Sequence, residues 1–183
     1  ICDDAIKYQT ASICIPPSYV KEAKAYVQDQ MAVCTVIGFP NGYNTTAVKK
    51  AETEDALKNG ADEIDMVMNY GALKEGDLET VKQDIAAVRA ACPGKVLKVI
   101  LETSQLSDDE IISACELAEL AEADFVKTST GFRGEGATAH HVKLMKTYFH
   151  GLVKASGGIR TKDDFQTMVD AGADRIGASA SVK

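Results

Sequence analysis

Short apolar runs alternate with helical stretches along the whole chain, and this alternation limits the fold more than any other feature. The runs are rich in valine and isoleucine and mostly continuous, as expected for parallel strands that are covered on both faces. Strands separated by helices form a parallel sheet, which predicts an α/β protein. We expect strands at residues 12–15, 31–37, 63–68, 96–101, 125–128, 152–155 and 175–178.

The segments between these runs carry the start and stop signals of helices. Ser107 and Glu110 fit a capping box, and Asp77 and Thr161 each precede apolar residues at helical spacing. A short turn recurs where a helix ends and a strand begins, twice with a glycine suited to a left-handed cap. This repeat, which we interpret as architectural, occupies residues 59–62, 121–124 and 171–174.

Two architectures fit this pattern, a (β/α)8 barrel lacking one unit or an open doubly wound sheet. No G-x-G-x-x-G motif follows the first strand, which weakens a dinucleotide-binding sheet. Polar residues of interest lie at the ends of several strands, and a barrel gathers such ends into one pocket. We therefore expect one barrel domain over residues 1–183, without linkers.

Two lysines at strand ends indicate amine chemistry. Lys127 and Lys154 each follow an apolar run and precede small, hydroxylic or glycine residues. A buried ammonium is costly without a partner, and a second ammonium nearby lowers a lysine pKa and frees its nucleophilic form. Lys127 could instead extend to solvent, but the polar residues 128–131 that follow could hold the oxygens of a substrate.

Asp65 is an acid inside an apolar strand. It is either a core carboxylate paired with a lysine or, in one barrel with Lys127 and Lys154, a proton-transfer partner. Lys98 could point into the same interior, and Glu102 could pair with either lysine.

Glycine turns follow the last two predicted strands. Gly157 and Gly158 follow the first of these strands, and Gly177 and Ser179 close the second. Glycines let backbone N–H groups approach a phosphate, and the last two strands of a barrel usually carry the phosphate site. The turn at residues 38–42 lies on the same rim and is expected to be a rigid loop.

Charge and composition exclude other functions. The net charge of −7 and the pI near 5.0 argue against a nucleic-acid partner. The five cysteines have no metal or disulfide spacing, which favours packing and a reducing compartment. No apolar run has membrane-spanning length and no signal peptide is evident, so we expect a cytoplasmic protein. His140, His141 and His150 have no spacing to carboxylates or cysteines that suggests a metal, so no metal is implied. His140 and His141 are interpreted as surface residues.

The chain resembles the deoxyribose-phosphate aldolase family over nearly its whole length. The resemblance implies that Lys127 is the Schiff-base lysine, Lys154 the second lysine and Asp65 the proton-relay acid. It implies phosphate-binding turns at Gly157, Gly158, Gly177 and Ser179, with Gly131 nearby. The segments that carry the resemblance are residues 35–40, 60–67, 69–77, 99–103, 123–132, 153–161 and 172–179.

The family pattern begins upstream of Ile1, with a first strand and helix that hold an Asp-His-Thr-like motif. Residues 1–9 are similar to the end of that helix, so we expect an N-terminally truncated barrel without its first strand. Arg133 and Glu135 stand where the family commonly has a more glycine-rich loop.

The resemblance implies a class I aldolase that splits 2-deoxy-D-ribose 5-phosphate reversibly into acetaldehyde and D-glyceraldehyde 3-phosphate. Such chemistry needs neither a metal nor an organic cofactor, because the lysine iminium accepts the electrons. The expected partners are these small molecules, and a homodimer is possible. Two alternatives stay open, a Schiff-base aldolase for another sugar phosphate and a non-catalytic truncated barrel that binds a phosphosugar.

Overall fold

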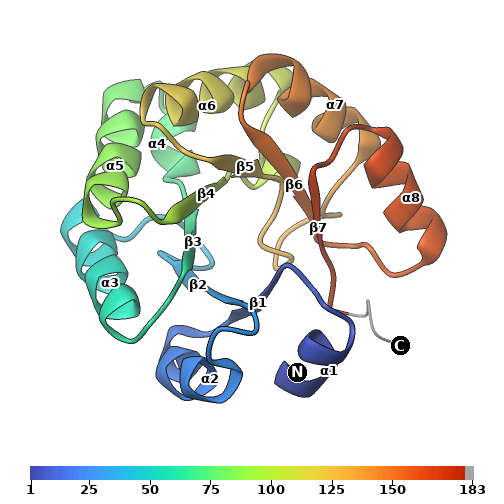
Figure 1. Ribbon diagram of the computed structural model, residues 1–183. Coiled ribbons are helices and arrows are strands. Elements are labelled where there is room, and N and C mark those ends of the chain that lie inside the picture. Colours follow the sequence, from blue (N-terminus) through green and yellow to red (C-terminus); the bar gives the residue numbers. More distant parts are fainter. Residues whose placement is uncertain (180–183) are drawn as a thin grey trace.

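The computed structural model describes residues 1–179, and residues 180–183 of the expected domain lie outside this part. All described strands run parallel and pair in chain order in one curled sheet, with the helices outside it (Figure 1). This arrangement confirms the expected α/β barrel-type fold. The strands are β1 Ser12–Ile15, β2 Ala32–Ile37, β3 Glu63–Val67, β4 Val96–Ile100, β5 Phe125–Lys127, β6 Leu152–Ser156 and β7 Arg175–Gly177.

The helices cover the outer face of the sheet. Figure 1 places α1 between α2 and α8, near the outer edges of β1 and β7. Within residues 1–179, these two edges pair with no further strand. The α-helices are α1 Cys2–Lys7, α2 Val20–Val27, α3 Thr46–Lys58, α4 Tyr70–Lys74, α5 Leu78–Ala91, α6 Asp108–Leu120, α7 Ala139–Tyr148 and α8 Lys162–Asp170, and the 3-10 helices are η1 Pro17–Tyr19 and η2 Thr103–Gln105.

The predicted helix starts are confirmed. Ser107 forms a capping box with Glu110 at the start of α6, and Thr161 forms one with Asp164 at the start of α8. Asp77 caps α5 by accepting a hydrogen bond from the N–H of Thr80. Each cap satisfies backbone donors that a helix cannot satisfy internally. Local sequence therefore sets where these helices begin.

The recurring turn has one backbone conformation in all three copies. Its second residue is left-handed each time, with φ of 101° at Gly60, 56° at Glu122 and 101° at Gly172. Glycine adopts this region without steric cost, whereas Glu122 has a side chain to accommodate. The turn geometry is therefore set by its place between helix and strand, not by glycine alone.

The aspartate that ends each copy of the turn ties two strands together. Its carboxylate accepts a hydrogen bond of 2.8–3.0 Å from the N–H of the second residue of the neighbouring strand. It also pairs with a basic side chain of a helix packed behind the sheet. The three sets are Asp62 with Val33 and Lys24, Asp124 with Leu97 and Arg89, and Asp174 with Val153 and Lys146.

A buried ion pair joins α3 to α5 behind the sheet. Lys49 is fully buried and pairs with Asp84, which is also buried. The Lys49 ammonium further donates 2.9 Å to the carbonyl of Val67 at the end of β3. The pair therefore fixes two helices to the end of a central strand.

Replacing Lys49 with Met should destabilise the fold by about 3 kcal/mol or more, because Asp84 stays buried without its cation. The free energy of unfolding in urea measures this. Lys50→Met is the matched control, since Lys50 is exposed and lies 3.8 Å from Glu54. The control should change stability by less than about 1 kcal/mol. Equal effects in the two variants would contradict a structural role for the Lys49–Asp84 pair.

Candidate active site

Lys127 and Lys154 lie side by side inside the curled sheet. Lys127 is the last residue of β5, and the parallel register pairs it with Lys154 of β6. Directly paired residues of neighbouring strands face the same side of a sheet. Both side chains are buried, with only 6% and 4% of each residue exposed. The structure thus brings together the two lysines that the sequence singled out.

Asp65 of β3 connects the two lysines. Its Oδ2 atom accepts hydrogen bonds from Lys127 Nζ at 2.8 Å and from Lys154 Nζ at 3.0 Å. Its Oδ1 atom accepts from Lys98 Nζ at 2.7 Å and from the Cys34 thiol at 3.1 Å. Lys98 therefore points into the same interior, as expected. The carboxylate itself is fully buried.

The cluster carries more basic groups than acidic ones. Lys98 also pairs with Glu63 at 2.7 Å, and Glu63 pairs with Arg175 at 2.9 Å. Two carboxylates thus serve four basic side chains, an excess of positive charge that favours an anionic ligand. The members are Asp65, Glu63, Lys98, Lys127, Lys154 and Arg175.

The charges in this cluster shift the pKa values of its members. Burial opposes ionisation of Asp65, but the ammonium groups of Lys127, Lys154 and Lys98 outweigh it and hold the pKa of the carboxyl well below its usual range. Burial also opposes the charge on Lys127, yet the Asp65 carboxylate outweighs it and raises the pKa of the lysine. The direction of this shift is opposite to the lowered Lys127 pKa that the sequence analysis expected. Asp65 attracts the proton more strongly than a neighbouring ammonium repels it.

The sequence analysis expected that Glu102 could pair with Lys127 or Lys154, but it pairs with neither. It lies at the end of β4 with a left-handed backbone, φ 59°, and its side chain is buried. Its carboxylate accepts hydrogen bonds from the hydroxyl and the N–H of Thr130, the latter at 3.3 Å. Burial raises the pKa of Glu102, although the bonds from Thr130 oppose the shift. Glu102 therefore positions the loop that follows Lys127.

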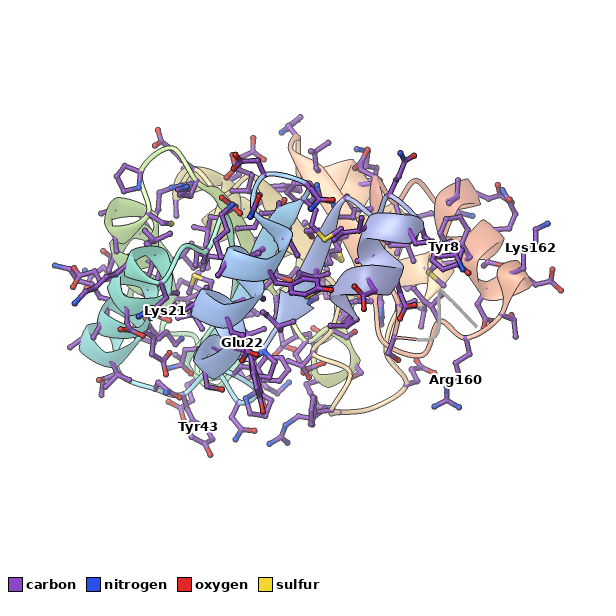
Figure 2. All side chains as sticks on the ribbon, turned by 60° about the horizontal axis from the view of Figure 1, so that its bottom comes forward. Tyr8, Lys21, Glu22, Tyr43, Arg160 and Lys162 are labelled. Atoms are coloured by element: carbon purple, nitrogen blue, oxygen red, sulfur yellow. The ribbon has the colours of Figure 1, made fainter. Side chains whose placement is uncertain are left out.

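A cavity of about 590 Å³ lies between the edge strands β1 and β7, beside both lysines, and reaches the rim formed by the carboxyl ends of the strands. Tyr43 and Arg160, which follow β2 and β6, lie along this rim at the lower edge of Figure 2. The cavity is lined by both lysines and by the glycine turns predicted to bind phosphate. These lining residues are Gly131, Gly157, Gly158, Gly177 and Ser179.

Steric reasons favour glycine in two of these turns, most strongly at Gly157 and Gly158. Gly157 and Gly158 have φ of 85° and 76°, which disfavours other residues. A Cβ atom at Gly158 would come within 2.7 Å of the carbonyl oxygen of Glu135. At Gly177, a Cβ atom would lie 3.1 Å from Lys154 Cε. Side chains at these positions would fill the cavity next to the amine.

Cys14 is a cavity residue that the sequence reasoning missed. It was assigned to packing, but it is exposed and lines the cavity beside Lys127. The strand register places it opposite Cys34. A hydrogen bond with the Cys34 thiol, against the effect of burial, lowers the pKa of Cys14 to about 7. The position of Cys14 in the cavity and its lowered pKa could not be predicted from the residue pattern, because both depend on the pairing of β1 with β2.

The sulfurs of Cys14 and Cys34 and a carboxylate oxygen of Asp65 lie within 4.8 Å of one another. These atoms are potential ligands for a thiophilic metal. Both oxygens of Asp65 already accept hydrogen bonds from lysines, so an ion here would have to displace an ammonium group. The arrangement suits ion pairing better than metal binding.

Cys14 should react with iodoacetamide faster than Cys92 or Cys115 at neutral pH. Its lowered pKa makes about half of it thiolate near pH 7, whereas burial raises the pKa of Cys92 and raises that of Cys115 to about 12. Peptide mass spectrometry across a pH series measures the three rates.

Cys34→Ala is the control, because it removes the hydrogen bond that lowers the Cys14 pKa. The midpoint of Cys14 alkylation should then move to higher pH. An unchanged midpoint would rule out the Cys34 thiol as the cause.

Comparison with known proteins identifies the family. Residues 1–181 match the model described as DeoC/LacD family aldolase. Deoxyribose-phosphate aldolase 2 of Staphylococcus aureus (strain N315) is 57% identical over 186 residues, which cover 100% of this chain and 84% of the relative.

Solved structures agree with this match. One from Coccidioides immitis is 51% identical with a TM-score of 0.97, over 99% of this chain and 74% of its own. The tetrameric deoxyribose phosphate aldolase of Aeropyrum pernix is 32% identical with a TM-score of 0.91, over 100% of this chain and 79% of its own. The chain, with its two buried lysines at strand ends, therefore belongs to the DeoC/LacD aldolase family.

Proposed function

We propose that this protein is a deoxyribose-phosphate aldolase, a lyase that cleaves 2-deoxy-D-ribose 5-phosphate reversibly to acetaldehyde and D-glyceraldehyde 3-phosphate. One observation carries the assignment of its site. Lys127 and Lys154 share one carboxylate oxygen of Asp65 at the floor of a cavity walled by glycine turns. This places an amine, a proton relay and an anion site together.

The reaction begins at the amine of Lys127. The neutral amine adds to the C1 aldehyde of the open-chain sugar, and loss of water gives an iminium ion. The C2–C3 bond then breaks, its electron pair moves toward the iminium to form an enamine, and the C3 hydroxyl gives up its proton. Protonation of the enamine and hydrolysis release acetaldehyde and restore Lys127. Because the lysine accepts the electrons, the mechanism needs no organic cofactor.

Asp65 and Lys154 move protons during these steps. Lys127 holds a proton at rest, since Asp65 raises its pKa, and must lose it before it attacks. Lys154 Nζ and Lys127 Nζ contact the same oxygen, which gives a proton a path between the lysines or to water in the cavity. We assign Asp65 and Lys154 to proton transfer on this geometry.

The phosphate of the substrate is assigned to the turns at the far wall of the cavity. Gly157, Gly158, Gly177 and Ser179 line it after the last two strands, and Gly131 lies beside Gly157. Backbone N–H groups there can approach an anion closely, because no side chain intervenes. The excess positive charge around Asp65 attracts the same anion.

Several broader features are inferred with the function. A phosphorylated substrate and the free thiols of Cys34, Cys92 and Cys115 fit a cytoplasmic location. Among residues 1–179, no helix is both long and apolar enough to cross a membrane. We infer a single barrel domain over residues 1–183. A homodimer is our proposal for assembly, with the tetrameric relative as the alternative.

Acetaldehyde with borohydride should leave a stable two-carbon adduct on Lys127, because borohydride reduces the iminium to a secondary amine. Peptide mass spectrometry locates the adduct. Lys127→Met should abolish it, while Lys154→Met should still be labelled at Lys127. An adduct that maps to Lys154 in the unmodified sequence would overturn the choice of nucleophile. Cleavage assays with 2-deoxyribose 5-phosphate and other sugar phosphates test the substrate separately.

Lys154→Met should shift the acidic limb of the pH–rate profile to higher pH. Lys154 competes with Lys127 for Asp65 Oδ2 and repels its ammonium. Without Lys154, the protonated form of Lys127 gains stability and its already raised pKa rises further, so the neutral amine appears only at higher pH. The measurement is kcat/KM for retro-aldol cleavage against pH.

Lys162→Met is the control for this shift. Lys162 is exposed at the start of α8 and points away from the ribbon (Figure 2). Its replacement should leave the profile in place. An acidic limb that does not move in Lys154→Met would show that Lys154 does not tune Lys127.

A further inference from the structure

Two histidines and an aspartate gather on the rim of the barrel, outside the lysine cluster. His140 and His141 lie in the first turn of α7, and Asp108 is the first residue of α6. These helices follow β5 and β4, so both begin at the carboxyl ends of the strands, where the cavity also opens. The sequence analysis expected surface histidines and no metal. It missed this cluster because Asp108 lies 32 residues before His140.

The three side chains are close enough to share one ion. A ligand atom from each lies within 4.8 Å of the others. His140 Nε2 is 2.8 Å and 3.0 Å from the two carboxylate oxygens of Asp108. Ligand atoms of a tetrahedral zinc site are about 3.3–3.6 Å apart, from bonds of about 2.0–2.2 Å. Small rotations of these side chains would therefore bring the three ligand atoms to the spacing of a zinc site.

The cost of such rotations is small for two of the three residues. The side chains of His140 and Asp108 are 63% and 54% exposed, so they can turn without repacking the core. The carboxylate also faces the first turn of α7, where it supplies the negative charge that a cation needs. Imidazole and carboxylate together are typical ligands of zinc.

His141 provides a second and independent indication. Its Nδ1 atom is buried and has no hydrogen-bond partner within residues 1–179. A buried polar atom without a partner is costly and calls for an explanation, and a bound ion is one such explanation. A bound ion would give this nitrogen a partner.

We propose that Asp108, His140 and His141 form a binding site for a divalent transition-metal ion, with Zn²⁺ as its occupant. Water completes the coordination, because the chain supplies these three ligands and the site faces solvent. The ion links the first turn of α6 to the first turn of α7. It thereby fixes the α7 end of the segment 128–138, which connects Lys127 to α7. The site takes no part in the aldol chemistry itself.

Isothermal titration calorimetry with zinc chloride tests this on chelator-treated protein. The expected result is one zinc per chain at the rim site. His140→Ala and His141→Ala should each weaken binding by at least about tenfold, as expected when a metal site loses support. His140 is exposed, so its variant should fold normally. Zinc should also raise the melting temperature of the unchanged protein but not that of His140→Ala.

His150→Ala is the matched control. His150 is exposed and pairs with Glu119 at 2.8 Å, much as His140 pairs with Asp108, but this pair has no second histidine. Its removal should leave zinc affinity unchanged. An equal loss in His150→Ala would mean that zinc binds any surface histidine and would overturn the proposal.

The thiols in the cavity are the main competitors for zinc. Cys14→Ser separates the two sites, because it leaves the rim residues intact. Cobalt(II) serves as an optical probe, since thiolate ligands give intense near-ultraviolet absorption that imidazole and carboxylate do not. Binding that survives Cys14→Ser without thiolate bands supports the rim site. Binding that is lost in Cys14→Ser, or unaffected in both His140→Ala and His141→Ala, contradicts it.

Discussion

The buried carboxylate of Asp65 is the interaction on which the interior of this barrel depends. It holds ammonium groups from three successive strands, Lys98 of β4, Lys127 of β5 and Lys154 of β6. Each of these charges would be costly inside a sheet without a counter-ion, by several kcal/mol even after relaxation. The contacts with Asp65 therefore allow the three lysines to be buried inside the barrel. Folding and site assembly rest on one carboxylate.

This dependence also constrains the chemistry. A carboxylate strong enough to keep three ammonium groups in the interior also keeps a proton on Lys127. The raised pKa of Lys127 favours its protonated form, so nucleophilic attack requires that proton to leave. Because Lys154 shares the same carboxylate oxygen, the charge can be redistributed inside the cluster. Lys154 competes with Lys127 for the same carboxylate oxygen and so favours loss of the Lys127 proton.

The sequence predicted what local patterns determine. Strand positions, the caps at Ser107 and Thr161, and the lysines at strand ends follow from nearest neighbours along the chain. Contacts between distant elements were not predictable in this way. Lys49 and Lys50 are adjacent in the same helix, yet one is buried with Asp84 and the other is exposed. Only the packing of α3 on α5 distinguishes them, and Cys14 likewise depends on strand register.

The two ends of the barrel have different roles: contacts at the amino ends of the strands stabilise the sheet, and residues at the carboxyl ends form the candidate active site. At the amino ends of the strands, Asp62, Asp124 and Asp174 each bind a strand N–H and a basic side chain, so the repeated turn ties strands in pairs. Each copy pairs an aspartate with a lysine or an arginine, and none of these residues lines the cavity beside Lys127 and Lys154. The loops at the carboxyl ends of the strands therefore do not have to hold neighbouring strands together. These loops carry the glycine turns, and the first turns of α6 and α7 carry the histidine cluster. Stability concentrated at one rim allows chemistry at the other.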